Sequence, residues 1–542
     1  MVKELTHFFT SIISETNGIS LEDTLELMTS YHVEQVSARA VKSVADFRER
    51  LLAYQISKAD IRALLDHPVS AALFQFFQHF PLKYREDHTH LTGALTADFV
   101  YPRLKKLLVG KNGKRIKEQI EHVYGPGSAH IRSKADVDKL IRLQKNEYFD
   151  RYLQIVFLTK LVLTNRTAHK EAAYFLANEL YTKYNVGHVR LKFTLSRKNS
   201  TRESEIIPGI ERLTPEDVVL GLYDGFAQFQ RAHPDFNFIL SPVFRKEPDY
   251  FDQSRFATKK EDVEDQVNAM LQMIERHPQL RDHLCEIDTV GDEKYFYRKQ
   301  HYLDMTKAFR KLQFAGFRIR SHHGETWKTL RRGIQAVDNA MNIWHIDSLE
   351  HGLALGVNPN YYFHSLFQRV VQWNIDGRAL KEGTIEYDEV MEMGWYDDDL
   401  GVRDKLIAGQ RLSYTEMITF TKAKFHTARE VEHYQHDILN RMINKQVSLV
   451  SLPSSNFRLT HFVPDFKDHP FSWWEKKGLQ LGVGTDNYVT LNTNYIREML
   501  ILLYTDAEYL KITKLLMVTT GETRRPYISS RLWEMRKIFN VD

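Results

Sequence analysis

KYREDHTH, residues 83–90, is the first of eight short segments that decide the expected fold of this chain. The strands of a closed parallel barrel are buried on both faces, so we expect them to be continuous apolar runs. By that pattern 83–90 is the weakest of the eight. The other seven are 187–194 (GHVRLKFT), 237–244 (NFILSPVF), 283–290 (HLCEIDTV), 316–322 (GFRIRSH), 344–350 (WHIDSLE), 447–452 (VSLVSL) and 479–485 (LQLGVGT).

Amphipathic helical stretches lie between most of these segments. Examples are YFDRYLQIVFLTKLVL, PEDVVLGLYDGFAQFQRA and EDVEDQVNAMLQMIER. A strand followed by a helix, repeated eight times, predicts an α/β protein with a (β/α)8 TIM barrel. The chain has 542 residues, whereas an ordinary barrel has roughly 250, so we expect additional segments.

The additional segments are assigned by their position along the chain. We predict an N-terminal helical region over 1–80, the barrel over 81–520 and a C-terminal extension over 521–542. Long insertions are predicted near 98–146 and 353–413, after the first and sixth strands. Connections of that length are usually functional or take part in assembly. Both are expected at the C-terminal face of the barrel, where barrel enzymes place their active sites.

Composition bounds the class of protein. Hydrophobic residues make up 43% and charged residues 27%, which is typical of a globular chain. The net charge of +4 is small for this length and argues neither for nor against a nucleic-acid ligand. No apolar run is long enough to predict a membrane span or a signal peptide. Cys285 is the only cysteine, which excludes an intrachain disulfide and a cysteine-based zinc site and favours a cytoplasmic location.

His88 and His90 end the first predicted strand. Side chains alternate along a strand, so these two histidines are expected to point to the same side, into the barrel mouth. Such a pair can bind a metal, although a His-x-His on a strand is more often a packed or surface pair. Further polar groups follow the ends of later strands and are expected on the same rim: His322, Glu325, His351, Asp486 and Asn487.

Five motifs occur in order along the predicted strands: HTHLTGAL (88–95), GDE (291–293), HHGE (322–325), EHG (350–352) and GTDN (484–487). SLPSSN (451–456) is a further match. Through these motifs, from about 83 to 500, the chain resembles the adenosine and AMP deaminase family of the metal-dependent amidohydrolase superfamily. The resemblance implies a hydrolase that removes the 6-amino group of an adenosine-type substrate and releases ammonia.

The resemblance also implies roles for individual residues. Zn²⁺ is the implied cofactor, with iron or another divalent ion left open, and a metal-acidified water attacks C6 of the purine. His351 would orient or deprotonate that water, and Glu325, with a raised pKa, would donate a proton at N1. Asp486 would share the role of base, and Gly291 would let the backbone approach the purine. The implied metal ligands are His88, His90, His322 and Asp486.

Three residues beside these motifs have competing interpretations. His323 follows a predicted ligand, and alternation turns it away from the barrel mouth, so a packing role is favoured over a role at the metal. Asp292 and Glu293 are as consistent with a solvated turn as with a site.

Two departures from the family bear on the substrate. Thr92 stands where adenosine deaminases have an Asp that binds the ribose 5′-hydroxyl, so the repulsion of a 5′-phosphate is absent. Asn487 replaces an Asp that contacts N7, and its amide could donate to N7. A basic run follows Thr92 and could neutralise phosphates, which favours AMP or ATP over adenosine, with a solvated helix face equally consistent. The run contains Lys105, Lys106, Lys111, Lys114, Arg115 and Lys117.

The long insertions and the helical N-terminus are similar to those of divergent deaminases from bacterial antiphage systems, such as the deaminase component of RADAR. That likeness implies a role in antiphage defence and an ATPase partner protein, and the surface insertions favour a homo-oligomer. Two alternatives remain at this point: another metal-dependent amidohydrolase acting on a different amine, and a non-catalytic scaffold of the same fold. Deaminases of the other zinc family, which act on nucleic acids, are disfavoured because they need a cysteine pair.

Overall fold

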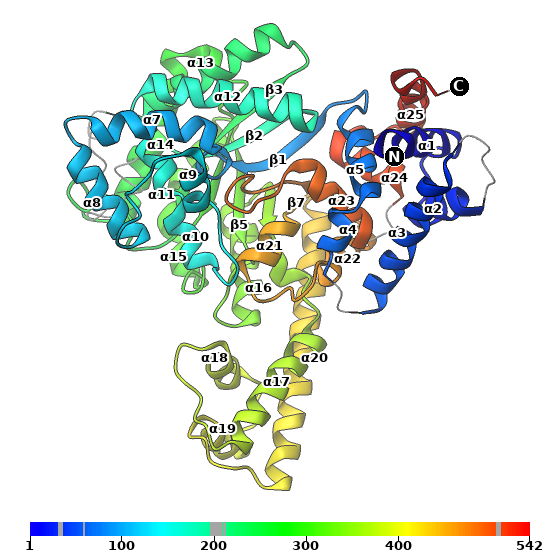
Figure 1. Cartoon of the computed structure of the whole chain (residues 1–542). Coiled ribbons are helices and arrows are strands. Elements are labelled where there is room, and N and C mark those ends of the chain that lie inside the picture. The colour runs from blue at the N-terminus through cyan, green and yellow to red at the C-terminus, as the bar shows by residue number, and fades with distance from the viewer. Residues whose placement is uncertain (31–35, 58–59, 196–209, 211–212, 506–510, 542) are drawn as a thin grey trace.

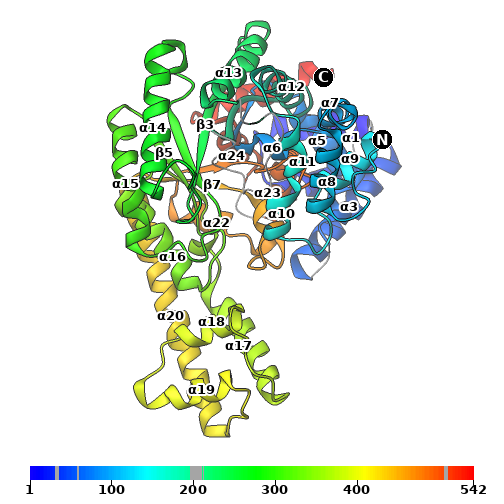
Figure 2. The same cartoon turned by 90° about the vertical axis from the view of Figure 1, so that its left-hand side faces the viewer.

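The structure is a computed structural model that describes residues 1–30, 36–57, 60–195, 210, 213–505 and 511–541. It has a barrel at its centre, a helical region that carries the N-terminus on one flank, and an arm of helices that projects from the barrel (Figure 1). A view from the side shows the same arm standing clear of the barrel (Figure 2).

The predicted (β/α)8 barrel is confirmed. Eight parallel strands are hydrogen-bonded in the order of the sequence, and each of them overlaps one of the eight predicted segments. The strands are β1 (Tyr84–His90), β2 (Val186–Thr194), β3 (Asn237–Arg245), β4 (Glu286–Val290), β5 (Arg318–His323), β6 (Ser348–His351), β7 (Ser448–Ser451) and β8 (Leu481–Val483). β6 begins four residues later than predicted, because Ala340–Trp344 form a π-helical turn, η4.

Backbone bonds at the ends of β1 and β8 close the barrel. The N–H of His90 donates to the carbonyl oxygen of Asp486 at 2.8 Å, and the N–H of Asp486 donates to the carbonyl oxygen of His88 at 2.9 Å. Thr89 and Asp486 form a parallel bridge. The residues that close the barrel are therefore residues predicted to bind metal.

The expectation of apolar strands is wrong for the inside of the barrel. On β2, Arg190 and Lys192 point inward, and Lys192 is fully buried. On β5, Arg320 is likewise buried and inward. The apolar residues between them, such as Val189, Leu191 and Ile319, belong to the hydrophobic core beneath the surrounding helices. The strands alternate because one face packs on helices and the other on buried charges.

Helices cover the outside of the barrel. Residues 1–80 contain α1 (Val2–Glu15), α2 (Leu21–Ser30), α3 (Ala38–Ile56), α4 (Arg62–Leu65) and α5 (Pro68–Gln78). The β1–β2 connection contains α6 (Leu91–Ala94), α7 (Ala97–Val109), α8 (Gly113–Tyr124), α9 (Lys134–Ile141), α10 (Phe149–Ile155), α11 (Phe157–Leu161) and α12 (Arg166–Tyr184). Later connections contain α13 (Pro215–Ala232), α14 (Lys259–Arg276), α15 (Lys299–Phe314), α16 (Leu330–Asn339), α21 (Pro453–Leu459) and α22 (Phe471–Lys477).

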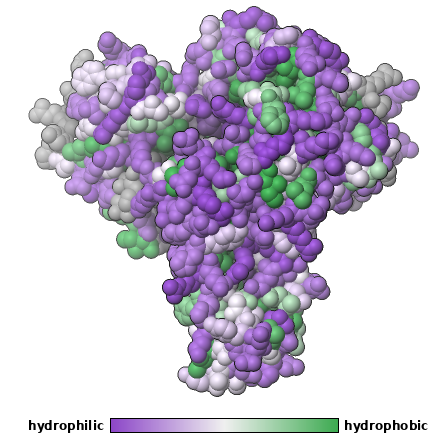
Figure 3. Space-filling view, turned by 180° about the vertical axis from the view of Figure 1, so that it is seen from behind, coloured by the Kyte–Doolittle hydropathy of each residue, from purple (hydrophilic) through white to green (hydrophobic). Residues whose placement is uncertain are grey.

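The connection between β6 and β7 forms the projecting arm. It consists of α17 (Pro359–Ile375), α18 (Ile385–Glu392), α19 (Leu400–Ile407) and α20 (Tyr414–Asn444), and α17 packs along α20 (Figure 1). α20 has 31 residues, which corresponds to about 46 Å. The surface seen from behind is mainly hydrophilic, on the arm as on the barrel (Figure 3).

The last helices, α23 (Tyr495–Thr505), α24 (Ile512–Thr520) and α25 (Arg525–Phe539), return the chain to the N-terminal region. α25 packs on α1, where Arg536 and Glu15 form an ion pair at 2.9 Å. Among the residues that the structure describes, no helix combines the length and apolar character needed to cross a bilayer.

Asn185 ties the start of β1 to the start of β2. It ends α12 in the left-handed conformation, with φ of 57°, and is buried. Its side-chain amide donates to the carbonyl oxygens of Phe80 at 2.8 Å and Leu82 at 3.0 Å, and its own carbonyl oxygen accepts from the N–H of Tyr84. One residue therefore aligns the two strands that begin the barrel.

We expect Asn185→Ala to lower the free energy of unfolding by about 2–4 kcal/mol, because two buried acceptors lose their donor and alanine is strained at positive φ. Asn185→Gly loses the same bonds without the strain and should be about 1 kcal/mol less destabilising. Urea unfolding of both variants measures the difference. Equal stability of the two would contradict the role of the backbone conformation.

Candidate metal centre

Four side chains at the C-terminal end of the barrel bring their ligand atoms together. The Nε2 atoms of His88 and His90 are 3.2 Å apart, and those of His90 and His322 are 3.3 Å apart. Oδ1 of Asp486 lies 3.4 Å from Nε2 of His90 and 3.7 Å from Nε2 of His88. A tetrahedral metal site with ligand distances of about 2.0–2.1 Å has edges of about 3.3–3.4 Å between ligands. Three of the four separations are close to such edges and the fourth is slightly longer, so these groups suit a divalent metal.

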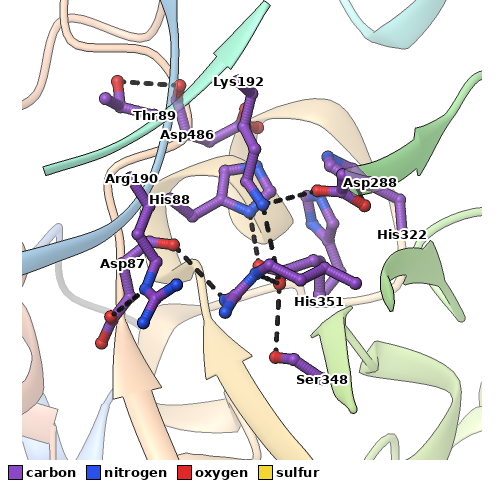
Figure 4. A network of polar contacts seen from close by, with 12 residues as sticks. Asp87, His88, Thr89, Arg190, Lys192, Asp288, His322, Ser348, His351 and Asp486 are labelled. Carbon is purple, nitrogen blue, oxygen red and sulfur yellow. Dashed lines mark hydrogen bonds and ion pairs between the residues drawn. The ribbon is translucent and has the colours of Figure 1, made fainter. Parts of the chain in front are cut away.

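Two buried carboxylates orient the histidine ligands from behind. Nδ1 of His88 lies 2.6 Å from Oε2 of Glu350, and Nδ1 of His322 lies 3.1 Å from Oδ1 of Asp288. An ionised carboxylate can only accept a hydrogen bond, so Nδ1 of both histidines carries the proton and Nε2 presents its lone pair toward the shared centre. Figure 4 shows the carboxylate of Asp288 beside His322, with a contact to Lys192.

Cations inside the barrel compensate these carboxylates. Nζ of Lys192 lies 2.7 Å from Oδ2 of Asp288 and 3.9 Å from Oε1 of Glu350, and Nε of Arg320 lies 2.7 Å from the same Oε1 (Figure 4). Burial alone would raise the pKa of Glu350, but the charges of Arg320 and Lys192 outweigh it and lower the pKa to about 2. Glu350 is therefore an anion that can hold the His88 proton.

Two residues of the site have left-handed backbone conformations. His351, at the end of β6, has φ of 67°, and Asp486, after β8, has φ of 61°. Such conformations cost of order 1–3 kcal/mol for residues other than glycine and persist only where surrounding contacts hold them. Oδ2 of Asp486 accepts a hydrogen bond from Ser455 at 2.5 Å, which is one such contact.

His351 is held by Asn456 so that its Nε2 atom faces the candidate metal centre. Its Nδ1 lies 2.9 Å from Oδ1 of Asn456, whose amide nitrogen in turn donates to Nε2 of His469 at 3.0 Å. An amide oxygen can only accept, so Nδ1 of His351 carries the proton. Nε2 of His351 is buried, lacks a hydrogen-bond partner among the described residues and lies 3.7 Å from Oε1 of Glu325. It is positioned to accept a proton.

Glu325 is held by the turn that follows β5. The carboxylate of Glu293 accepts the backbone N–H groups of Gly324 at 3.1 Å, Glu325 at 2.6 Å and Thr326 at 2.8 Å. Burial, and then the charge of Glu293, raise the pKa of Glu325 to about 8. Glu325 is therefore protonated at neutral pH, as the predicted role requires. Glu293 is buried, so the solvated-turn interpretation fails for it.

A cavity opens above these residues. It is lined by His90, His322, Glu325, His351 and Asp486, and has a volume of about 970 Å³ including its open mouth. Thr92 and Gly291 also line it, as predicted, and so do the aromatic side chains of Phe149 and Tyr152. A Cβ at Gly291 would lie 2.2 Å from the carboxylate of Glu247, so only glycine fits there.

Asn487 does not line the cavity. Its amide nitrogen donates to Oδ1 of Asp486 at 2.6 Å and to the hydroxyl of Tyr152 at 2.9 Å. Gly93 packs against its side chain so closely that a Cβ at that glycine would overlap Oδ1 of Asn487. Asn487 thus positions a metal-site carboxylate and an aromatic wall, and its donors are already engaged.

The cations at the cavity are not those of the basic run. Lys105, Lys106, Lys111, Lys114, Arg115 and Lys117 are all exposed on or between α7 and α8, and none lines the cavity. The solvated-face interpretation therefore describes them. Lys160, Arg245 and Lys259 line the cavity instead, together with the acidic Asp262. They come from α11, β3 and the start of α14.

Several residues that shape the site carried no recognised signal in the sequence. Asp288 and Glu350 are the Nδ1 partners of two histidines, Lys192 joins them, and Asn456 sets the tautomer of His351. Alternation was the available signal, because Lys192, Asp288 and Glu350 each lie on the inward face of a predicted strand. His323 is buried against Tyr302 and Ser321, so its predicted packing role is confirmed.

Comparison with solved structures finds the same barrel in other proteins. An amidohydrolase from Burkholderia ambifaria with bound zinc superposes with a TM-score of 0.51 at 15% identity, covering 86% of this chain and 95% of that one. An adenine deaminase from Arthrobacter aurescens gives 0.48 at 13% identity, covering 84% and 99%. An N6-methyl-AMP deaminase from Arabidopsis thaliana gives 0.47 at 14% identity, covering 86% and 98%.

At these identities the structural likeness supports the shared fold alone. No family model matches the sequence, and no curated protein matches it.

Asp288→Asn and Glu350→Gln should each weaken metal binding by about 10–100-fold, because each removes the anion that orients a ligand histidine. Competition with a chelator, followed by metal analysis, measures the change. Glu286→Gln is the matched control, since Glu286 is also a buried barrel carboxylate, paired with Arg190 and Arg320, but contacts no histidine ligand. An equal loss in the control would mean that any buried charge matters, and would contradict the specific role.

Proposed function

We propose that this protein is a zinc-dependent deaminase that hydrolyses the 6-amino group of a purine nucleotide. The observation that carries the proposal is one cavity at which three imidazoles and Asp486 bring their ligand atoms close together. Beside them lie the Glu325 carboxyl, whose pKa is raised to about 8, and Nε2 of His351, which has no hydrogen-bond partner among the described residues. An acid and a base flanking one metal-activated water are what hydrolytic deamination of an aromatic ring requires.

Zinc is the metal we assign, held by His88, His90, His322 and Asp486. Neutral imidazoles and one carboxylate suit Zn²⁺, and zinc is bound in the B. ambifaria amidohydrolase of the same fold. A zinc ion held there would lower the pKa of a water molecule toward neutrality and so make its deprotonation easier.

The protein's own residues move the protons. Nε2 of His351 accepts a proton from the water as its oxygen adds to C6, and the Glu325 carboxyl donates a proton to N1, where negative charge develops. His351 then gives its proton to the amino group, which leaves as ammonia. The remaining hydroxyl proton returns to the Glu325 carboxylate, and the product is the 6-oxo purine.

The cavity walls suit a purine nucleotide. Phe149 and Tyr152 offer aromatic faces, and the glycine at 291 keeps one wall free of a side chain. Arg245, Lys160 and Lys259 place positive charge in the same cavity, and Thr92 adds no carboxylate to oppose a phosphate. We therefore favour a phosphorylated substrate over free adenosine. The cations that support this choice are not those of the basic run that the sequence suggested.

A related amidohydrolase acting on another amine is the second candidate. The observation that favours it is the engagement of the Asn487 amide by Asp486 and Tyr152, which leaves it no donor for N7 of adenine. Incubation of the zinc-loaded protein with adenosine, AMP, ATP and dATP, read by mass spectrometry for a gain of one mass unit, separates the two. Conversion of none of the four by metal-loaded protein would reject the deaminase and favour the second candidate.

We expect kcat/KM to fall as pH rises through about 8, because the Glu325 carboxyl, with its pKa raised to about 8, loses the proton that it must donate. Glu325→Gln cannot donate a proton to N1 and should lower kcat by about 10²–10⁴-fold, with the alkaline fall removed. The variant should keep its metal, since Glu325 is not a ligand. An unchanged alkaline fall in the variant would assign it to another group.

Arg245→Gln should lower kcat/KM for AMP by about 10–100-fold, the loss of one charge-assisted hydrogen bond, and should change kcat/KM for adenosine far less. Lys105→Gln is the control, because Lys105 is a cation of the exposed basic run. Steady-state kinetics on both substrates gives the comparison. A selective loss of AMP turnover in the Lys105 variant, with none in the Arg245 variant, would move phosphate recognition to the insertion.

A further inference from the structure

The opposite, N-terminal end of the barrel contains a second cavity, and four arginines line it. They are Arg85, Arg190, Arg318 and Arg320. Two carboxylates also line it, those of Asp87 and Glu522. The wall is completed by the first residues of β7 and β8 and by the turn that follows α24. This cavity is separate from the candidate metal centre, which lies where the strands end.

The inward faces of the same strands contribute polar side chains to both ends of the barrel. On β5, Arg318, Arg320 and His322 alternate along one face, so two guanidinium groups lie below a predicted metal ligand. On β2, Arg190 lies below Lys192 in the same way. Parallel strands begin together at one end of the barrel, so the arginines near their starts converge there.

Two of the four arginines, Arg190 and Arg320, are paired with the buried carboxylate of Glu286. Glu522 is engaged outside the cavity by Arg524, through two contacts of 2.8 Å. Asp87 is shared, with Arg190 at 3.2 Å and Arg85 at 3.6 Å. Arg320 and Arg318 differ in whether they form ion pairs.

Arg320 is paired with Glu350 at 2.7 Å, deeper in the barrel. Arg318 is exposed and forms no ion pair within 4.0 Å with any residue that the structure describes. Asp347 is close enough to feel the charge of Arg318, but one of its oxygens accepts the N–H of Ile319. Arg318 and Arg85, whose side chain is 38% exposed and only 3.6 Å from a shared Asp87, are therefore the guanidinium groups least engaged by carboxylates at the cavity mouth.

Two glycines keep the cavity walls closely fitted. A Cβ at Gly482 would lie 2.7 Å from Oδ2 of Asp87, and a Cβ at Gly521 would lie 2.4 Å from Nη1 of Arg85. Gly521 has φ of 72°, which other residues adopt only with strain. The Arg85 guanidinium thus packs closely on the turn at Gly521.

We propose that this cavity binds a phosphate group, as inorganic phosphate or as the phosphate of a small molecule. Guanidinium groups present paired N–H donors that match two oxygens of a phosphate, and charge-assisted bonds of this kind are the strong ones. Ser448, Gln480 and Thr523 line the same cavity and offer neutral donors beside the arginines. The site lies apart from the proposed catalytic cavity and does not depend on the proposed reaction.

Titration of the full-length protein with inorganic phosphate at constant ionic strength, followed by calorimetry, tests the proposal. Wild type should show saturable binding, and Arg318→Gln should weaken it by at least 10-fold, with a further loss on adding Arg85→Gln. Arg281→Gln, which replaces an exposed arginine outside both cavities, is the matched control and should bind as wild type. Because Arg318 is exposed and unpaired among described residues, its replacement should leave thermal unfolding without phosphate nearly unchanged.

The Arg245→Gln variant separates this site from the catalytic cavity. Phosphate binding that survives Arg245→Gln and is lost in Arg318→Gln supports the proposal, whatever the outcome of the deaminase assays. Binding that is lost in Arg245→Gln and retained in Arg318→Gln would assign the phosphate to the catalytic cavity and overturn it, as would the absence of saturable binding to wild type. A tripolyphosphate arm identifies the source: tighter binding than phosphate indicates a polyphosphate chain, and equal binding a single phosphate group.

Discussion

Buried charges inside the barrel must neutralise one another, and the rest of the structure follows from how they pair. Lys192 and Arg320 reach the carboxylates of Asp288 and Glu350, while Arg190 reaches Asp87 and Glu286. An unpaired charge in this interior would be strongly destabilising, whereas a paired one is tolerated. The pairing therefore contributes more to the positions of the side chains than to the stability of the fold, because each carboxylate keeps a second lone pair that can accept another hydrogen bond.

That second lone pair connects the charged barrel interior to the candidate metal centre through a hydrogen bond. Each carboxylate contacts a cation and a histidine: Glu350 contacts Arg320 and Nδ1 of His88, and Asp288 contacts Lys192 and Nδ1 of His322. A histidine whose Nδ1–H is held in this way can turn only Nε2 toward a metal. The core of such a barrel is normally made of branched aliphatic side chains. In this chain the core is charged, and its charges position the candidate metal ligands.

The backbone imposes a matching constraint at the rim. Asp486 closes the barrel through hydrogen bonds with the backbones of His88 and His90, and its left-handed conformation places its carboxylate beside their rings. The same residue, Asp486, thus closes the barrel and places a carboxylate among the candidate ligands. The two ends of the barrel differ in their polar groups: imidazoles lie at the C-terminal cavity, and four arginines line the N-terminal one.

Local pattern determined much of this protein. Short apolar runs between amphipathic helices predicted eight strands at nearly their observed positions. Six polar residues at or just after the ends of predicted strands could be named from the motifs that resemble a known family: His88, His90, His322, Glu325, His351 and Asp486. Only the tertiary structure decided which side chains become partners. Lys192 and Arg320 face Asp288 and Glu350, and Asn487 is engaged by its neighbours. Likewise, the cations that line the cavity are Lys160, Arg245 and Lys259, while the basic run near 105–117 faces solvent. Periodicity fixes which way a side chain points from its own strand, whereas pairing depends on which strands become neighbours, and that is set by the closure of the whole barrel.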